Sequence, residues 1–572
     1  MCEIVIIRYD VRIVAVLGLL LGLLVSFFFV PVHAQNRKGV WAKHGMVASQ
    51  STHATEVGLE ILERGGNAVD AAVAASLALG VTEQYHSGIG GGGFILIFDA
   101  GTEEVTAIDA REKAPVKAHR DMFPGDGGSG MSREGPLAVG VPGLLAGLDE
   151  AVREFGTMRL KELIAPSVSL AREGFEIGHY FSRTLVRKEE KLKRHPETAK
   201  VYLLPDGSPP PPDHILVQRD LARTYERIAA EGVDLFYKGE LGEKIARYVQ
   251  QEGGLITTND MSSYEPVRRE PVRGTYHGYR IYSMPPPSSG GVHLVQMLNA
   301  LEEYDLGALG FGSSGYVHLL AEVMKWAFRD RAEYLGDPDF VDVPVARLVS
   351  KEYAEEFRRL VNQDAVLQLE KRLEQKQEGA HTSHLSVVDR WGNAVAITQT
   401  VNLNFGSGLI VPGTGIVLND EMDDFSSRPG VPNAFGLVGS EANAIAPGKR
   451  PLSSMTPTIV TKDGKVVLVL GSPGGPKIIT SVLQVILNVL DFGMGVSEAV
   501  AAPRVHHQWK PDSLFVERYG FGKDVLENLT SRGHSLAERG PWSSVQAIFV
   551  DPATNYRFGA ADKRLEGSAA GH

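Results

Sequence analysis

Cysteine is almost absent from the sequence, which has 572 residues and a single cysteine, Cys2. Such a chain has no disulfide framework, no thiolate nucleophile and no cysteine-ligated metal site. Histidine motifs for metals are missing as well, because there is no H-E-x-x-H and the 17 histidines are dispersed. We therefore predict no metal and no cofactor, and the reactive group must lie among other side chains.

The sequence also lacks a cluster of basic residues. Its 58 Lys and Arg residues are scattered and are outnumbered by 69 Asp and Glu residues, which gives a net charge of -11. Nucleic-acid binding relies on a basic patch or stripe that meets the phosphate backbone. We therefore predict that nucleic acid is not a partner.

The first 34 residues have the pattern of an export signal. Arg8 and Arg12 precede a largely apolar run over residues 13–30, and residues 32–34 (VHA) suit a signal peptidase. We predict a periplasmic or extracellular protein whose mature chain begins near Gln35. The alternative is an uncleaved membrane anchor, because a run of about eighteen such residues can just span a bilayer. The protein would contact a membrane only in that case.

Helical and strand patterns alternate in the rest of the N-terminal half. Residues 56–64 are predicted to form a helix that ends at Gly65-Gly66, and Asn67 is predicted to cap an alanine-rich helix. The run FILIFD, residues 94–99, then has the composition of a strand. The charged segment 350–377 is predicted to be helical, with little to commit it to a core.

The chain from Ser383 onward is predicted to be mostly strand. Hairpins are expected at residues 390–393 and at Asp463-Gly464, and residues 125–130 (GDGGSG) and 208–213 (SPPPPD) are expected to be loops. Together these patterns favour stacked layers, with sheets inside and helices outside.

A glycine-rich stretch, SGIGGGGF, formally contains the dinucleotide-binding pattern at Gly88, Gly90 and Gly93. That pattern requires a strand before it and a helix after it, so that backbone amides point at a phosphate. Here the order is reversed. We therefore interpret the stretch as a turn in which two backbones approach closely. No G-x-S-x-G sequence of a serine hydrolase is present either.

Thr382 stands between two histidines, His381 and His384, at the start of a predicted strand. A threonine hydroxyl is a poor nucleophile without a base, but a threonine that begins a chain can use its own α-amine. Such an amine titrates at about 7.7 to 8.0 in model peptides, so part of it is neutral near pH 7. This chemistry requires a cut between His381 and Thr382. Spacing alone favours the simpler interpretation, in which Thr382 and Ser383 only begin a strand.

Three polar clusters follow in the sequence: Asn402, the acidic run of residues 419–424 (NDEMDD), and the pair Ser453-Ser454 with GSPGG at residues 471–475. Buried acids would need a cationic partner, and a bound ammonium group is one such partner. The alternative is a solvated acidic loop.

Taken together, these segments resemble the gamma-glutamyltransferase family, also called gamma-glutamyl transpeptidase or glutathione hydrolase. The resemblance extends from about Gly45 to the C-terminus and depends on the number and order of the motifs GNAVDAAVAASLALGVTE, SGIGGGGF, DAREKAP, MPPPSSGG, HTSHLSVVD, NDEMDDFS, KRPLSSMTPTIV and GSPGG.

The resemblance implies an α+β fold, a four-layer αββα sandwich of the N-terminal-nucleophile hydrolase type. It further implies that the precursor cuts itself between His381 and Thr382. The products would be a large subunit, residues 35–381, and a small subunit, residues 382–572, which form the fold jointly. The implied substrates are glutathione and other γ-glutamyl amides, with water, amino acids or dipeptides as acceptors.

The family's functional residues have counterparts at matching positions of this sequence. Thr382 matches the nucleophile, Thr400 the threonine that positions it, and Gly474 and Gly475 the backbone amides that stabilise the oxyanion. The counterparts for substrate binding are Arg111, Ser453 and Ser454 for the α-carboxylate, and Asn402, Glu421 and Asp424 for the α-amino group.

Two departures from the family pattern are visible. Glu421 is acidic where some members have glutamine, which should strengthen the preference for a cationic α-amino group. Phe435 lies in the loop that covers the site, where a tyrosine is common, and phenylalanine lacks the hydroxyl hydrogen bond. We therefore expect looser closure of this loop.

Two alternatives remain at this point. One is an acylase of glutaryl or cephalosporin-type amides, although Asp424 would then face an uncharged substrate end. The other is an inactive exported binding protein that keeps the fold, with Thr382 structural and the chain uncut.

Overall fold

The computed structural model describes residues 39–123, 130–367, 382–427 and 430–572, and Gly39–His572 forms one compact unit. The predicted export signal, His381 and most of the loop 125–130 lie outside the described residues. Among the helices in the described part of the chain, none is long and apolar enough to cross a membrane.

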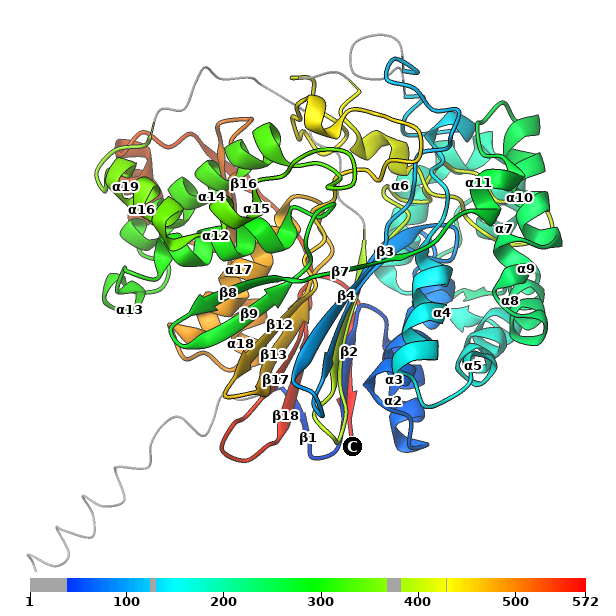
Figure 1. Cartoon of the computed structure of the whole chain (residues 1–572), viewed down its shortest axis with the longest axis horizontal. Helices are drawn as coiled ribbons and strands as arrows, with labels where there is room; N and C mark the ends of the chain where they lie inside the picture. The colour runs from blue at the N-terminus through cyan, green and yellow to red at the C-terminus, as the bar shows by residue number, and fades with distance from the viewer. Residues whose placement is uncertain (1–38, 124–129, 368–381, 428–429) are drawn as a thin grey trace, which may run out of the picture. The chain divides into compact units, whose positions relative to one another are not determined.

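Two seven-stranded sheets form the centre of the structure, and every neighbouring pair of strands in them is antiparallel (Figure 1). The first sheet has the order β1 (Val40–Ala42), β18 (Arg557–Ala561), β17 (Gln546–Val550), β13 (Lys465–Gly471), β12 (Thr458–Lys462), β9 (Tyr279–Ser283) and β8 (Val272–Tyr276). The second has the order β19 (Ser568–Gly571), β2 (Met46–Ser49), β10 (Ser383–Val388), β11 (Ala394–Thr400), β3 (Gly92–Asp99), β4 (Glu104–Ala110) and β7 (Val267–Arg269).

Helices cover the outer faces of both sheets, as Figure 1 shows. The first sheet is covered by α12 (Gly290–Leu301), α17 (Lys477–Leu490) and α18 (Val496–Ala501), with α14 (Ser314–Tyr334) and α16 (Lys351–Leu360) packed on α12. The second sheet is covered by α2 (Thr52–Glu63), α3 (Ala68–Thr82) and α4 (Leu144–Phe155). The inner faces pack on each other through β10, β11, β13 and β17. The prediction of sheets inside and helices outside is confirmed.

Smaller elements complete the described chain. They are α5 (Leu160–Glu173), α6 (His179–Arg194), α7 (Pro196–Tyr202), α8 (Arg219–Glu231), α9 (Asp234–Tyr237), α10 (Glu240–Gln251), α11 (Thr258–Ser262), α13 (Leu306–Leu309), α15 (Val345–Leu348), α19 (Lys523–Ser531), the 3-10 helices η2 (Pro136–Ala138), η3 (Glu421–Asp424) and η4 (Glu441–Asn443), and the strands β5 (Phe175–Glu176), β6 (Ile215–Leu216), β14 (Val505–His506), β15 (Leu514–Glu517) and β16 (Leu536–Arg539).

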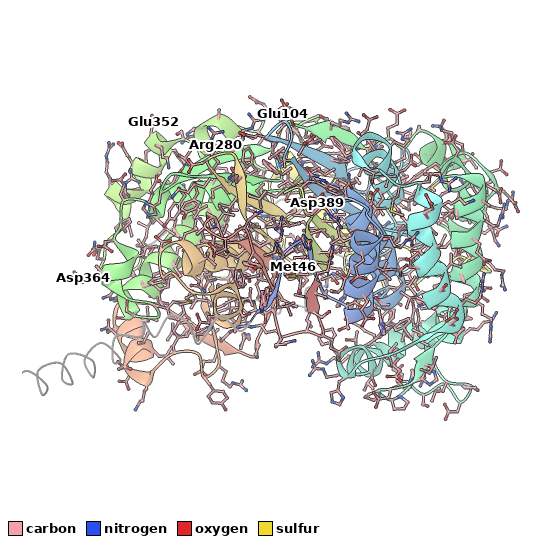
Figure 2. All side chains as sticks on the ribbon, turned by 90° about the horizontal axis from the view of Figure 1, so that it is seen from below. Met46, Glu104, Arg280, Glu352, Asp364 and Asp389 are labelled. Atoms are coloured by element: carbon pink, nitrogen blue, oxygen red, sulfur yellow. The ribbon has the colours of Figure 1, made fainter. Side chains whose placement is uncertain are left out.

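Strand β3 illustrates why the central strands are apolar without alternation. Phe94, Leu96 and Phe98 belong to the core between the sheets, where Met46 also lies (Figure 2), whereas Ile95 and Ile97 belong to the core under the helices. Successive side chains point to opposite faces of a strand, and both faces are buried here. The run FILIFD is therefore a strand, as predicted.

Most local predictions hold. Helices α2 and α3 correspond to the predicted pair. Asn67 caps α3, because its side-chain oxygen accepts from the backbone N–H of Asp70, and the carboxylate of Asp70 accepts in turn from the backbone N–H of Asn67. Both hairpins form, as β10–β11 and β12–β13, and residues 208–213 are a loop.

Two local predictions need correction. Only residues 351–360 of the described part of segment 350–377 are helical, and this helix does contribute to the core. Tyr353, Ala354 and Phe357 are buried, while Glu352 lies on the periphery in Figure 2. Three apolar residues on one face are enough for such packing. The strand-rich second half also contains α17, which the sequence analysis did not predict, although Thr480, Gln484 and Asn488 recur at helical spacing along it.

Both sheets combine strands from the two sides of Thr382. In the second sheet, β10 lies between β2 and β11, and β11 lies between β10 and β3. In the first sheet, β9 from before Thr382 pairs with β12 from after it. A chain cut ahead of Thr382 would therefore remain paired through backbone hydrogen bonds and a shared core.

The glycine turn before β3 brings backbones together, as predicted from its sequence. A Cβ atom on Gly90 would lie 2.0 Å from the carbonyl oxygen of Val417, and one on Gly91 would lie 2.0 Å from that of Thr400. Asn419 also binds the carbonyl of Gly90 through its backbone N–H, at 3.1 Å. The turn therefore fixes the end of β11 and the start of the acidic run.

We predict that Gly91→Ala lowers the free energy of unfolding by about 3 kcal/mol or more, because a clash with backbone cannot be relieved by a rotamer change. The measurement is the thermal unfolding midpoint. Gly315→Ala in α14 is the control, since its Cβ would make only an ordinary contact at 3.6 Å. Equal stability of the two variants would contradict the prediction.

Candidate active site

A small cavity brings together nearly all the residues singled out in the sequence. It encloses about 20 Å³, room for about one water molecule, and is lined by Arg111, Arg331, Thr382, Thr400, Asn402, Glu421, Asp424, Phe435, Leu437, Ser453, Ser454, Met455, Gly475 and Ile478. Of the predicted site residues that the structure describes, Gly474 alone lines a neighbouring cavity instead. A substrate can enter only if some of these side chains move.

Thr382 directly precedes β10, which begins at Ser383. The residue is 5% exposed and lines the cavity. The interpretation that Thr382 begins a strand is therefore compatible with a hydroxyl in a site. Pairing of β10 with β2 and β11 on its two edges holds this end of the strand in place.

Thr400 is the last residue of β11, and Asn402 follows in a left-handed conformation with φ of 74°. The backbone N–H of Asn402 donates to Oγ1 of Thr400 at 2.8 Å, and its Nδ2 donates to the carbonyl of Asp420 at 3.0 Å. Left-handed non-glycine residues are uncommon and are found at functional sites, where the surrounding structure holds them. These bonds join the end of β11 to the acidic run.

Arg111 follows β4 and is almost fully buried. Its guanidinium donates to Glu421, to Oδ2 of Asp424 at 2.6 Å and to the carbonyl of Pro451 at 3.2 Å. The predicted carboxylate-binding arginine and two of the predicted ammonium-binding groups are therefore paired with one another. A zwitterionic ligand would exchange these internal pairs for its own carboxylate and ammonium groups.

The charges in this cavity change one another's pKa values. Burial alone would lower the pKa of Arg111, but Glu421, Glu112 and Asp424 together raise it above its usual value. Burial raises the pKa of Glu421 and of Asp424, against the opposing effect of Arg111. Burial also raises the pKa of Glu112 to about 7. Two acids, Glu421 and Asp424, and two arginines, Arg111 and Arg331, line the cavity, and Glu112 lies 3.5 Å from Arg111, so the site has partners for both charges of a zwitterion.

The acidic run of residues 419–424 is buried, so the alternative of a solvated acidic loop is wrong. Oδ1 of Asp420 accepts from the N–H of Leu403 at 2.9 Å, and Asp423 accepts from the hydroxyl of Ser132 at 2.6 Å. These backbone and hydroxyl donors compensate for burial. The cationic partner that the run needs is Arg111.

Ser453 and Ser454 lie between the first sheet and α14. The hydroxyl of Ser453 accepts from the N–H of Met455 at 3.1 Å, and that of Ser454 accepts from Arg331 at 3.3 Å. Arg331 also donates to the hydroxyl of Ser289, at 3.0 Å. Both serines line the cavity, as predicted.

Arg331 was missed in the sequence analysis. It is a buried guanidinium, and burial lowers its pKa to about 10. It makes no ion pair with any carboxylate in the described part of the chain, so a ligand carboxylate would be its natural partner. The helical spacing could have revealed it, because Arg331 follows Met324 and Phe328 on the apolar stripe of α14, at i+7 from Met324, where a charged residue is unexpected.

Gly474 and Gly475 have positive φ values of 139° and 55° and lie just before α17. A Cβ atom on Gly474 would lie 2.2 Å from Oγ of Ser543. Backbone N–H groups at the start of a helix have no partner within the helix and carry a partial positive charge. In α17 the first two such groups, of Lys477 and Ile478, donate to the carbonyls of Gly474 and Gly475 at 3.2 Å and 3.0 Å, and each glycine lines a different cavity.

His384, the described neighbour of Thr382 in the motif, is a packing residue. Its Nδ1 lies 2.8 Å from Oγ1 of Thr398 and its Nε2 lies 3.1 Å from Oγ of Ser386. Burial lowers its pKa to about 3, so it is neutral. Both ring nitrogens are engaged, which leaves none to act as a base toward Thr382.

Within the described residues, His318, Glu322 and His534 are close enough to hold a metal ion, a cluster that the sequence analysis missed. Nδ1 of His318 lies 2.7 Å from Nε2 of His534, which is a hydrogen bond. Glu322 already pairs with Lys325 at 3.0 Å and accepts from the N–H of Leu367 at 2.7 Å. Because Lys325 would repel a cation, these groups fit a hydrogen-bonded cluster better than a metal site.

Phe435 and Leu437 cover the cavity with apolar surface. Phe435 is nearly buried, and its loop is held by Asn433, whose Oδ1 accepts from the N–H groups of Phe435 and Leu437. The looser closure expected from phenylalanine stays a prediction.

The fold and the cavity define an α+β protein of the N-terminal-nucleophile hydrolase class. The structure superimposes on the cephalosporin acylase of Bacillus halodurans with a TM-score of 0.82 and 28% identity, covering 95% of this chain and 98% of that one. It also matches the gamma-glutamyltranspeptidase of Helicobacter pylori with a TM-score of 0.54 and 42% identity, covering 56% of this chain and 92% of that one.

The chain belongs to the gamma-glutamyltranspeptidase family, whose model matches residues 54–572. It is 48% identical to the glutathione hydrolase proenzyme of Escherichia coli K12, over 92% of this chain and 91% of that protein. The resemblance drawn from the motifs is confirmed.

We predict that Asn402→Ala destabilises the protein by about 1 kcal/mol more than Asn402→Gly. Both substitutions remove the side chain, but only alanine must be forced into the left-handed conformation. Thermal unfolding midpoints of matched preparations measure the difference. Identical midpoints would show that the backbone of residue 402 is not strained.

Proposed function

We propose that this protein is a self-processing glutathione hydrolase and γ-glutamyltransferase. The observation that carries the proposal is the cavity in which Thr382 lies beside Arg111 and the carboxylates of Glu421 and Asp424. These groups match both ends of an amino acid zwitterion, and the hydroxyl lies within the same cavity. Similarity to the glutathione hydrolase proenzyme of Escherichia coli over most of both chains supports the same activity.

The precursor is cut between His381 and Thr382, which gives a large subunit of residues 35–381 and a small subunit of residues 382–572. The subunits jointly form a four-layer αββα sandwich. The interleaving of strands supports this division, because each sheet draws strands from both pieces. The name proenzyme for the Escherichia coli relative also supports processing.

The substrate's α-carboxylate binds Arg111 with help from Ser453 and Ser454, and Arg331 adds a second positive charge behind Ser454. A planar guanidinium can bind a carboxylate through two parallel hydrogen bonds. The α-ammonium group binds Asn402, Glu421 and Asp424. Arg111 exchanges its pairs with Glu421 and Asp424 for the substrate's charges, so no group is left buried without a partner.

The reaction is an acyl transfer through an ester. The α-amine of Thr382 takes the proton of its hydroxyl, and the oxygen attacks the γ-carbonyl carbon while Thr400 positions it. Backbone amides at Gly474 and Gly475 stabilise the oxyanion. The C–N bond then breaks and the leaving amine takes the proton. Water or the amine of an amino acid or dipeptide resolves the ester, and no cofactor takes part.

An acylase that acts on glutaryl or cephalosporin-type amides is the second candidate, favoured by structural similarity to the Bacillus halodurans acylase. Such substrates lack the α-ammonium group. Glu421 and Asp424 would then remain paired with Arg111, and the substrate's carboxylate would have to compete with them for its guanidinium group. The charges of the cavity therefore favour the γ-glutamyl group.

The protein acts outside the cytoplasm, in a periplasm or in the medium, and contacts a membrane only if its N-terminal apolar segment is retained. The basis is the signal-like sequence of residues 1–34.

We predict that the purified protein consists of two fragments, the smaller beginning at Thr382, and that Thr382→Ala remains a single chain. The reason is that only a hydroxyl at this position can attack the preceding carbonyl. Intact mass and N-terminal sequencing measure the outcome. Thr382→Ser is the control, since it keeps a hydroxyl and should still be cut. A single uncut species in the wild type would instead favour an inactive binding protein.

We predict that kcat/KM for γ-glutamyl-4-nitroanilide exceeds that for glutaryl-4-nitroanilide by about 100-fold, because Glu421 and Asp424 stabilise the α-ammonium group that only the first compound has. Asp424→Asn should reduce this ratio by at least tenfold. The neighbouring variant Asp423→Asn is the control, since Asp423 faces Ser132 and Ala434 and should keep the ratio. Faster turnover of the glutaryl compound by the wild type would favour the acylase.

A further inference from the structure

Glu112 is a buried acid beside the active-site cavity, and the reaction proposed above does not use it. It follows Arg111 just after β4, and its side chain is 1% exposed. Its Oε2 lies 3.5 Å from a guanidinium nitrogen of Arg111, and the same nitrogen donates to Oε1 of Glu421. The two glutamates therefore meet at one nitrogen atom of Arg111.

The carboxylate of Glu112 packs against bare backbone on the side away from Arg111. A Cβ atom on Gly92, the first residue of β3, would overlap with Oε2 of Glu112, and one on Gly140 would lie 3.1 Å from the Cβ of Glu112. The missing side chains of two glycines thus make room for this carboxylate. Its place beside Glu421 is therefore fixed by the backbone around it.

Three oxygen atoms of this glutamate pair lack hydrogen bonds. Both side-chain oxygens of Glu112 and Oε2 of Glu421 are buried and have no hydrogen-bond partner among the described residues. Ionised carboxylates have only acceptors, so two of them cannot hydrogen-bond to each other. A protonated carboxyl group is also a donor, so one proton between the two glutamates would give each of them a partner.

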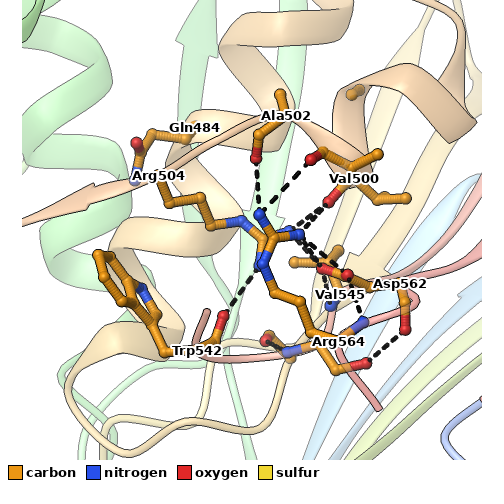
Figure 3. A network of polar contacts seen from close by, with 12 residues as sticks. Gln484, Val500, Ala502, Arg504, Trp542, Val545, Asp562 and Arg564 are labelled. Atoms are coloured by element: carbon orange, nitrogen blue, oxygen red, sulfur yellow. Dashed lines mark hydrogen bonds and ion pairs between the residues drawn. The ribbon is translucent and has the colours of Figure 1, made fainter. Parts of the chain in front are cut away.

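The network around Asp562 shows how the same protein binds ionised acids in its interior. Arg504 donates to Oδ2 of Asp562 at 2.6 Å, and Arg564 donates to Oδ1 at 2.9 Å (Figure 3). Arg564 also donates to Glu517, at 2.6 Å. Two arginines thus match two acids, and each acid accepts from a guanidinium group. Glu112 accepts no such hydrogen bond in the described part of the chain.

The charges around Glu112 do not match in this way. Two arginines, Arg111 and Arg331, face three acids, Glu112, Glu421 and Asp424. With all three acids ionised, this buried group would carry one excess negative charge, which one proton cancels. The other titratable groups that act on this pair are Asp420, Tyr237 and Tyr264. Burial raises the pKa of both tyrosines, so they are neutral.

The titration of the pair agrees with the geometry. Burial raises the pKa of Glu112 to about 7, against the effects of Arg111 and of a hydrogen bond with Glu421. Burial also raises the pKa of Glu421 well above its usual value, against the effect of Arg111, and Glu112 adds to the rise. Two close carboxyl groups titrate as a unit, because both cannot readily ionise together. The pair therefore holds a proton below neutral pH and loses it as the pH rises.

We propose that Glu112 and Glu421 share one proton in the free protein, and that Glu112 thereby sets how strongly the cavity prefers a cationic α-amino group. The inference rests on the proposed function and concerns the same site. With the proton, the arginines and acids balance. Without it, an added negative charge stabilises the substrate's α-ammonium group and opposes a substrate that brings only a carboxylate. Glu112 acts through Glu421 and is a positioning residue.

The first test measures kcat/KM for γ-glutamyl-4-nitroanilide and glutaryl-4-nitroanilide from about pH 6 to about pH 8, on both sides of the pKa of Glu112. The leaving group is the same, so proton transfers in the chemical step affect both compounds alike. In the wild type, the ratio of γ-glutamyl to glutaryl turnover should rise about tenfold with pH. Glu112→Gln and Glu421→Gln cannot share a proton and should give a ratio that stays constant.

Asp423→Asn is the matched control. Asp423 is a buried acid of the same 3-10 helix, η3, but it accepts from the hydroxyl of Ser132 and from the N–H of Ala434. This variant should keep the rise of the wild type. Intact mass should show that each variant is cut as the wild type is, and two glutamine variants keep the test decisive if one of them fails to fold.

Asp420 is the neighbouring acid that could hold the proton instead. It accepts from the N–H of Leu403 at 2.9 Å, and burial raises its pKa to about 8, against the effect of Lys191. Asp420→Asn should keep the rise of the ratio with pH. Loss of the rise in Asp420→Asn, with the rise kept in both glutamine variants, would assign the proton to Asp420 and overturn the inference.

The second test is infrared spectroscopy, which does not need turnover. The carbonyl band of a protonated carboxyl group is separate from the bands of ionised carboxylates, and carboxyl groups with ordinary pKa values are already ionised at about pH 6. Between about pH 6 and about pH 8, the wild type and Asp423→Asn should lose a band that Glu112→Gln and Glu421→Gln do not have.

Either of two results would overturn the inference and leave the proposed function intact. One is a ratio that rises equally in the wild type and in both glutamine variants, and the other is an infrared band that persists in both variants. Failure of the wild type to cleave either anilide would overturn the proposed function, whereas the infrared spectra would still show whether the two glutamates share a proton.

Discussion

The pairing of Arg111 with Glu421 and Asp424 is the interaction on which the site depends. Arg111 follows β4, before Thr382, and the two acids lie in η3, after it. Breaking one partner of a buried pair costs about 3–5 kcal/mol, because the other charge is left without compensation. The segments before and after Thr382 are therefore held together at this cavity. Under the proposed function, the same charges exchange their internal pairs for the charges of a zwitterionic substrate.

Backbone geometry brings the remaining groups to this pair. The turn at Gly90-Gly91 lets the carbonyls of Val417 and Thr400 approach closely, and Asn419 ties the acidic run to the same turn. Thr400 ends β11, and β10 lies alongside it, so the position of Thr382 follows from the register of one hairpin. This hairpin pairs with strands from before Thr382 on both edges, so the proposed cut ahead of Thr382 would free an amine while the strand that follows the hydroxyl stays in place.

The sequence predicted the layers and most of the cavity, and its failures have physical causes. Caps, hairpins and the glycine turn are local, so they could be read from short segments, and the family motifs brought Arg111, Asp424 and Ser453 together. The acidic run was open to interpretation as a solvated loop because its partner Arg111 is more than 300 residues away. Arg331 was missed because it lies on the apolar stripe of α14, where a charge looks like an interruption of packing. Helix α17 was missed although Thr480, Gln484 and Asn488 recur at helical spacing, because it is rich in the β-branched Ile and Val residues that favour strands.

The Gly474–Gly475 dipeptide lies between two cavities that differ in size and in charge. On the side of Gly475 the cavity is small, is lined by Phe435, two acids and two arginines, and matches the charges of an amino acid zwitterion. On the side of Gly474 the cavity is large, and most of the charged residues that line it are cations. Under the proposed function, the small cavity holds both the α-ammonium and the α-carboxylate group, so the arrangement of charges around Arg111 orients the donor. The γ-carbonyl would then lie beside the dipeptide, where the backbone amides of Gly474 and Gly475 are proposed to stabilise the oxyanion.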